Sequence, residues 1–117
     1  MFIQPKVAVK SNMSMVNLQS PEFCVRRLKV LADTTRFQIL KILMKKPSHV
    51  GEMNTVLKIE QSLLSHHLKV LREEGFVQAN RDGKAVLYCL APGIRLSPQD
   101  GIDLGCCQLS FPLQRED

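Results

Sequence analysis

Four cysteines are the side chains of this 117-residue sequence with the most distinctive chemistry. They stand at Cys24, Cys89, Cys106 and Cys107, so that two of them are adjacent. Soft thiolates select thiophilic ions, and trivalent arsenic and antimony favour three thiolates in a pyramid. Two thiols are enough to form a disulfide when an oxidant or a persulfide is sensed. The sequence therefore predicts thiol chemistry and leaves its target open.

Patterns typical of enzymes do not stand out in the sequence. It has no Cys-x-x-Cys motif, and no Gly-rich phosphate loop, carboxylate pair or Ser-His-Asp arrangement stands out. His66 and His67 are poorly placed to grip one metal, because adjacent side chains on a helix point about 100° apart. We expect His66 to contact DNA and His67 to pack at a domain edge. We predict no enzyme activity and no organic cofactor.

A second group of residues has the character of a DNA-reading surface. A helix predicted over about residues 60–74 carries leucines on one face and short polar side chains on the other. The first turns of such a helix meet base edges in the major groove, and cations beside a hairpin turn suit phosphate. Leu63 is placed to touch a thymine methyl group or to lie in solvent. The predicted DNA contacts are Gln61, Ser62, Leu63, Ser65, His66, Lys69, Arg81 and Lys84.

Three shorter helices are predicted before this one. The first begins at Pro21, because proline suits the first helical turn. Asp33 is expected to cap the second helix, which Pro47 ends. We expect Ser48 to cap a short third helix over about residues 49–57.

Two strands and a C-terminal segment follow the polar helix. Gly75 is placed to end that helix. The hydrophobic period then changes to 2 over residues 76–81 and 84–90, with Asp82-Gly83 as the hairpin turn. The predicted organisation is a flexible basic arm over 1–20, a DNA-binding domain over 21–91 and a cysteine-containing segment over 92–117, irregular apart from one short helical turn at most.

Length and charge agree with one small DNA-binding domain. The chain carries a formal charge of +5 and a pI of about 9.2, which favours a polyanionic partner. No apolar run approaches the roughly 18 residues of a membrane span, and the first ten residues do not form a signal peptide. We predict a cytoplasmic protein without a membrane partner, whose cysteines are mostly reduced. Met13 or Met15 remains an alternative start.

Three motifs in order resemble the arsenic-repressor (ArsR/SmtB) family of metal-sensing repressors. The family's recognition helix resembles residues 61–75, QSLLSHHLKVLREEG. The entry to its second helix resembles residues 31–36, LADTTR, and its wing resembles residues 81–84, RDGK. The resemblance covers about residues 21–91. It implies a mainly α winged helix-turn-helix fold with a small antiparallel β-hairpin. It also implies a homodimer that represses transcription from an imperfect palindrome and releases it when an inducer binds.

The resemblance also narrows the inducer. The family's Cys-x-Cys site falls on His49 and Gly51, and Gly51 has no ligand atom. The long C-terminal helix with Asp, His and Glu ligands of its zinc, nickel and cobalt sensors is not apparent here. Arsenite or antimonite bound by three thiols is therefore the expected inducer, with a metal site formed by Cys24, Cys106 and Cys107.

The position of Cys24 fits that expectation and also a second interpretation. Cys24 lies on the helix that resembles the family's dimerisation helix, near which the C-terminal segment is expected to run. Cys24 of one subunit could therefore join Cys106 and Cys107 of either subunit. Cys24 could equally be a small buried side chain. Cys89 is a weaker candidate, because strand alternation points it outward.

Two alternative functions stay open. A repressor that senses oxidants or persulfide needs only two thiols, and cuprous copper is another soft ion. A winged helix can also bind a protein partner instead of DNA. The polar face and the basic wing argue against that function, and a strongly salt-dependent DNA affinity would reject it.

Overall fold

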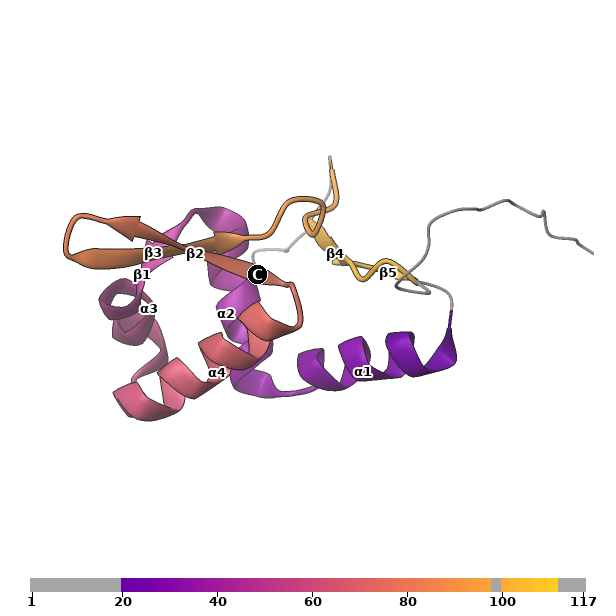
Figure 1. Cartoon of the computed structure of the whole chain (residues 1–117), viewed down its shortest axis with the longest axis horizontal. Coiled ribbons are helices and arrows are strands. Elements are labelled where there is room, and N and C mark those ends of the chain that lie inside the picture. The colour runs from indigo at the N-terminus through magenta and orange to yellow at the C-terminus, as the bar shows by residue number, and fades with distance from the viewer. Residues whose placement is uncertain (1–19, 98–99, 112–117) are drawn as a thin grey trace, which may run out of the picture.

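Four helices and five short strands make up the computed structural model, which describes residues 20–97 and 100–111. The predicted N-terminal arm, apart from Ser20, lies outside the described residues. Within them, no helix is long and apolar enough to cross a membrane. Figure 1 shows the order α1 (Pro21–Leu31), α2 (Thr34–Lys45), β1 (Ser48–His49), α3 (Val50–Leu57), α4 (Gln61–Glu73), β2 (Val77–Asp82), β3 (Ala85–Leu90), β4 (Gly101–Asp103) and β5 (Gln108–Ser110).

Side-chain caps fix the starts of the first two helices. Proline occupies the first turn of α1 as predicted, and the Ser20 hydroxyl accepts a 3.0 Å hydrogen bond from the Phe23 amide. The Asp33 carboxylate caps α2 by accepting from the Arg36 amide at 3.0 Å, which confirms the predicted cap. That hydrogen bond lowers the pKa of Asp33, because it stabilises the ionised carboxylate.

The predicted Ser48 cap of α3 is wrong. Ser48 lies in β1, where it pairs with Tyr88, and its buried hydroxyl donates to the Lys46 carbonyl. The residue before α3 is His49, whose amide donates a 2.7 Å hydrogen bond to the Glu52 carboxylate. Because Ser48 is held in β1 by strand pairing, it does not cap α3. The Glu52 carboxylate in the first turn of α3 accepts the hydrogen bond of the His49 amide instead.

One asparagine side chain holds the turn between α3 and α4. Asn54 donates to the Ile59 carbonyl at 2.8 Å and accepts from the Ile59 amide at 2.9 Å. Lys58 between them adopts a left-handed conformation with φ 54°. The two bonds fix where α4 leaves α3, so the turn is set by side-chain bonding to backbone.

Gly75 ends α4 as predicted, in the left-handed conformation with φ 84°. The Gly75 amide donates to the Arg72 carbonyl at 3.0 Å, and the Phe76 amide donates to the Leu71 carbonyl at 2.9 Å. These two bonds form a Schellman motif, which satisfies the last carbonyls of the helix.

Gly75→Ala is expected to lower the free energy of unfolding by about 1–2 kcal/mol, because a side chain strains this conformation. An added Cβ would meet the Arg27 guanidinium at 3.7 Å, an ordinary contact, so the cost lies in the backbone. Gly51→Ala is the matched control, because Gly51 lies in the first turn of α3 with nothing within 4 Å of an added Cβ. Gly51→Ala should stabilise by about 0.5–1 kcal/mol. Urea denaturation of both variants checks the prediction, and equal effects of the same sign would contradict it.

The wing is a three-stranded antiparallel sheet in the order β1-β3-β2. Asp82 pairs with Ala85, so the two turn residues are Gly83 and Lys84. The predicted Asp82-Gly83 turn is therefore displaced by one residue, because glycine with φ 68° takes the first turn position. The strand β1 was not predicted, since two residues give no periodicity. Helix-turn-helix followed by this wing confirms the predicted winged helix-turn-helix fold with its small antiparallel hairpin.

The C-terminal segment is a second hairpin rather than the irregular chain that was predicted. The strands β4 and β5 pair antiparallel, and Ile102 and Leu104 are completely buried. Figure 1 shows this hairpin beside α1, at the opposite end of the molecule from the tip of the wing. Three-residue strands are too short for a clear period, but burial of their apolar side chains holds them in the main core.

Candidate nucleic-acid interface and thiol cluster

The polar face of α4 is open to solvent along its length. Its opposite face supplies Leu64, Leu68 and Leu71, all with 0% exposure, to the core. Burial of this stripe therefore fixes which face of the helix points outward. The side chains predicted to contact DNA are all exposed on α4 or the wing: Gln61, Ser62, Leu63, Ser65, His66, Lys69, Arg81 and Lys84.

Two details of the first turns of α4 bear on its chemistry. Leu63 is 45% exposed, although most large apolar residues of α4 are buried. Ser62 donates a long hydrogen bond of 3.4 Å to the Glu60 carboxylate, which leaves its oxygen available to other donors. The first turns therefore present an apolar side chain among short polar ones, a combination that suits base edges and thymine methyl groups.

A histidine of β1 joins the tip of β2 to the start of α3. The His49 Nε2 atom lies 2.9 Å from an Asp82 carboxylate oxygen near the tip of β2, and its Nδ1 atom lies 3.3 Å from Glu52. The hydrogen bond to Asp82 raises the pKa of His49, because it favours the protonated ring. Protonation therefore strengthens the contact that fixes the wing beside α3.

The free energy of unfolding is expected to fall less between pH 6 and pH 8 in His49→Gln than in the wild type. Because the folded pKa is raised, His49 stabilises the fold fully below its unfolded pKa of about 6.5, and this contribution disappears as the pH rises through the folded value. Urea unfolding at pH 6 and pH 8 measures the difference, with His66→Gln on exposed α4 as the control. The same pH dependence in His49→Gln and the wild type would contradict this role.

His67 is a packed side chain, as predicted, and it lies against the start of α2 rather than at a domain edge. It is 7% exposed, and its Nδ1 atom lies 3.1 Å from the Arg36 guanidinium. Burial lowers the pKa of His67, because the charged ring would lose its hydration. His67 is therefore a packing residue that accepts a hydrogen bond, whereas His66 is exposed.

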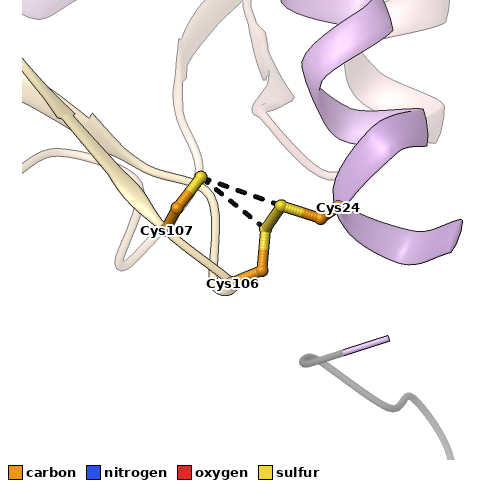
Figure 2. A group of neighbouring side chains, drawn as sticks. All are labelled: Cys24, Cys106 and Cys107. Atoms are coloured by element: carbon orange, nitrogen blue, oxygen red, sulfur yellow. Dashed lines mark hydrogen bonds between the residues drawn. A yellow bond between two sulfur atoms is a disulfide. The ribbon is translucent and has the colours of Figure 1, made fainter. Parts of the chain in front are cut away.

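The three cysteines of the predicted metal site meet in one subunit. Cys24 comes from α1, and Cys106 and Cys107 come from the loop between β4 and β5 (Figure 2). Their sulfur atoms all lie within 4.8 Å of one another. A disulfide joins Cys24 to Cys106, and the Cys107 sulfur lies 3.8 Å from Cys24 and 3.7 Å from Cys106. We call these three residues the thiol cluster.

The state of each cysteine limits what the cluster can do. Cys107 is exposed and is a free thiol, whereas the sulfurs of Cys24 and Cys106 are already bonded. Three thiolates become available only after that disulfide is reduced. Cys89 is also free, but it lies on β3, where its sulfur accepts a 3.7 Å hydrogen bond from the Asn80 amide group. It does not belong to the cluster.

A buried arginine beside the cluster was not predicted. Arg27 is 9% exposed, and it donates to the carbonyl groups of Leu104 and Glu74, each at 3.0 Å. Its neighbour Arg26 forms a 2.9 Å ion pair with the Glu74 carboxylate. The sequence held one signal: Arg27 stands three residues after Cys24 and four before Leu31, within the apolar stripe of α1.

The outer face of α1 remains apolar in part. Val25 is 49% exposed and Leu28 is 39% exposed. A shallow groove along this face is lined by Pro21, Glu22, Val25, Arg26 and Lys29. Exposed apolar side chains gathered on one helix are typical of a surface that binds another protein.

Comparison with known proteins places the helix-turn-helix and part of the wing in a recognised group. Residues 33–79 match the profile of the bacterial regulatory proteins of the arsR family. The transcriptional activator HlyU of Vibrio cholerae is 39% identical over 64 residues, which are 55% of this chain and 59% of that protein. The chain thus spans less than two thirds of this curated relative.

Solved structures agree with the same assignment. Reduced HlyU from Vibrio cholerae superposes with a TM-score of 0.57 at 37% identity, covering 60% of this chain and 74% of that chain. The homodimeric winged helix-turn-helix DNA-binding domain of a possible ArsR-family regulator from Mycobacterium bovis gives a TM-score of 0.56 at 30% identity. That match covers 60% of this chain and 65% of that chain.

Proposed function

Because this chain belongs to the ArsR family of bacterial regulatory proteins, we propose that it is a homodimeric transcriptional repressor that a thiophilic inducer releases from operator DNA. The observation that carries this proposal is the meeting of three cysteines from two distant segments beside a DNA-reading fold. The arsR-family match and the regulator names of the relatives support regulation rather than catalysis. An operator-binding repressor acts in the cytoplasm of a bacterium.

DNA binding rests on α4 and the wing. The helix would enter the major groove with Gln61, Ser62, Leu63 and Ser65 toward base edges. His66 and Lys69 would lie farther along it, and Arg81 and Lys84 would reach phosphates. All eight side chains are exposed, and the chain has a net charge of +5. The exposed apolar side chains of α1 would form the dimer contact.

The inducer we propose is arsenite or antimonite. Arsenous acid would react with the three thiols of Cys24, Cys106 and Cys107, form three arsenic–sulfur bonds and release three water molecules. The close sulfur atoms favour this product, because little chain entropy is lost in bringing them together. The reaction needs the reduced cluster, so the Cys24–Cys106 disulfide must first be opened.

The disulfide itself favours a second inducer class. Hydrogen peroxide would oxidise the thiols of Cys24 and Cys106 to the disulfide. The two thiols lose two protons and two electrons, and the peroxide is reduced to two water molecules. The bonded pair is the oxidised product of that reaction. The two reactions can be told apart by treating the reduced chain with each inducer and then counting the thiols that still react with a chromogenic disulfide. Arsenite should protect three thiols of the reduced chain, whereas one equivalent of peroxide should remove two.

Salt dependence tests DNA binding itself. Fluorescence anisotropy of the reduced protein on its own promoter fragment should give an affinity that falls steeply with salt. Arg81→Ala and Lys84→Ala should each reduce the slope of log K against log salt by about 2, because each removes one phosphate contact from each of the two subunits. Lys58→Ala, in the turn before α4, is a matched control for loss of charge. Salt-independent binding, or no binding, would favour a protein-interaction module instead.

A further inference from the structure

Arg27 donates hydrogen bonds to Leu104, in the loop that carries Cys106 and Cys107, and to Glu74, at the end of the recognition helix. We propose that Arg27 is a positioning residue that couples inducer binding at the cluster to the orientation of α4. This inference rests on the proposed function and adds the route by which the inducer site acts on the DNA-reading helix. It concerns contacts within one subunit, so it holds for either inducer class.

On the cluster side, Arg27 contacts the loop that carries the two adjacent cysteines. Its Nη1 atom donates a 3.0 Å hydrogen bond to the Leu104 carbonyl. The Leu104 amide donates to the Cys107 carbonyl at 2.9 Å, and the Leu104 side chain is completely buried. Arg27 also stands one helical turn after Cys24 on α1. Arg27 belongs to α1 and is hydrogen-bonded to the cysteine loop, so a change in the spacing between α1 and this loop alters the position of its guanidinium.

On the DNA side, Arg27 contacts the cap that ends α4. Its Nη2 atom donates a 3.0 Å hydrogen bond to the Glu74 carbonyl, directly before Gly75. Its guanidinium lies 4.3 Å from the centre of the Phe76 ring, and the Phe76 amide closes the Schellman motif. The ion pair between Arg26 and the Glu74 carboxylate adds a second contact of α1 with the same residue.

The arrangement responds sharply to displacement. The Arg27 charge is buried and held by two neutral carbonyl groups, while its Nε atom has no hydrogen-bond partner. A buried cation that loses a carbonyl cannot replace it with bulk water, so the bond to Leu104 and the bond to Glu74 are hard to change separately. These contacts are those of the disulfide-bonded chain. When arsenic binding, or a change in the state of the disulfide, alters the spacing between the loop and α1, the cap of α4 has to follow.

Arg27→Met tests the coupling in the full-length reduced protein. Anisotropy titrations would give the DNA dissociation constant with and without arsenite, and isothermal titration would give the arsenite affinity with and without DNA. In the wild type each ligand should weaken the other by the same factor, within the 5–150-fold range usual for allosteric coupling. Arg27→Met should bind each ligand alone, with the factor falling close to 1. Arg72→Met, which removes the same charge from exposed α4, should keep the wild-type factor.

A second variant and a second readout cover a failure of Arg27→Met to fold. Arg27→Lys keeps the charge but lacks the forked donors, so its coupling factor should also fall. In the wild type, arsenite should change hydrogen exchange of the Phe76 amide, and in Arg27→Lys it should not. If the wild type releases DNA and both Arg27 variants release it by the same factor, the role of Arg27 is overturned. If the wild type binds no DNA, or keeps it both with arsenite and with peroxide, the proposed function fails and the inference fails with it.

Discussion

Replacing Cys106 and Cys107 together by serine is expected to leave DNA affinity unchanged and to abolish release by arsenite. Neither residue lies on α4 or the wing, so the DNA-reading surface stays intact. One remaining thiol of the cluster cannot supply the three bonds of bound arsenic. The wild type should lose about 5–150-fold in DNA affinity when arsenite binds, and the double variant should lose nothing. Anisotropy titration with and without arsenite measures both values.

Single variants then distinguish the two inducer classes. Cys24→Ser should abolish release by arsenite and by peroxide, because both use that sulfur. Cys107→Ser should abolish the arsenite response but keep the peroxide response, since the Cys24–Cys106 pair survives. Cys89→Ser on β3 is the control and should behave as the wild type. If the Cys106, Cys107 double variant still released DNA on addition of arsenite, the arsenite site would have to lie elsewhere in the protein.

Closing the Cys24–Cys106 disulfide is expected to raise the free energy of unfolding by about 2–4 kcal/mol. The bond joins residues 82 positions apart, so it removes much conformational freedom from the unfolded chain. It also ties the C-terminal hairpin to α1. Urea denaturation of the oxidised and reduced protein measures the difference.

Two variants show whether the difference between oxidised and reduced protein comes from the disulfide or from another effect of the reductant. In Cys24→Ser the oxidised and reduced samples should unfold alike, because no bond can form. In Cys107→Ser the difference should persist, because the bonded pair is intact. Loss of the difference in Cys107→Ser would mean that the stabilising bond uses Cys107 instead.

The periodic part of the fold could be predicted, because long amphipathic helices carry their own signals. Pro21, Asp33 and Gly75 mark helix ends by local chemistry that tertiary contacts did not override. Ser48 shows the limit of such reasoning. A serine before a helix is a good cap, but strand pairing with Tyr88 requires a residue 40 positions away in the sequence, which no local pattern reveals.

The candidate site could be predicted in its members but not in its connections. Thiol chemistry singled out Cys24, Cys106 and Cys107, and the structure brings these three sulfurs together in one subunit. The contacts of Arg27 could not be predicted from the sequence, because both of its hydrogen-bond acceptors are backbone carbonyl groups. Such acceptors depend on where two distant loops end, and every residue type carries them. The β4–β5 hairpin was missed for a related reason, since its stability comes from burial in the core.

The most direct test of the account is the DNA dissociation constant of the reduced wild-type protein, measured with and without stoichiometric arsenite. Tight, salt-sensitive binding that weakens at least 5-fold on addition of one arsenite per chain is the predicted result. Antimonite should act in the same way, and zinc should not. Tight binding that arsenite leaves unchanged would contradict the thiol cluster as the arsenite site, and the absence of DNA binding would contradict the repressor itself.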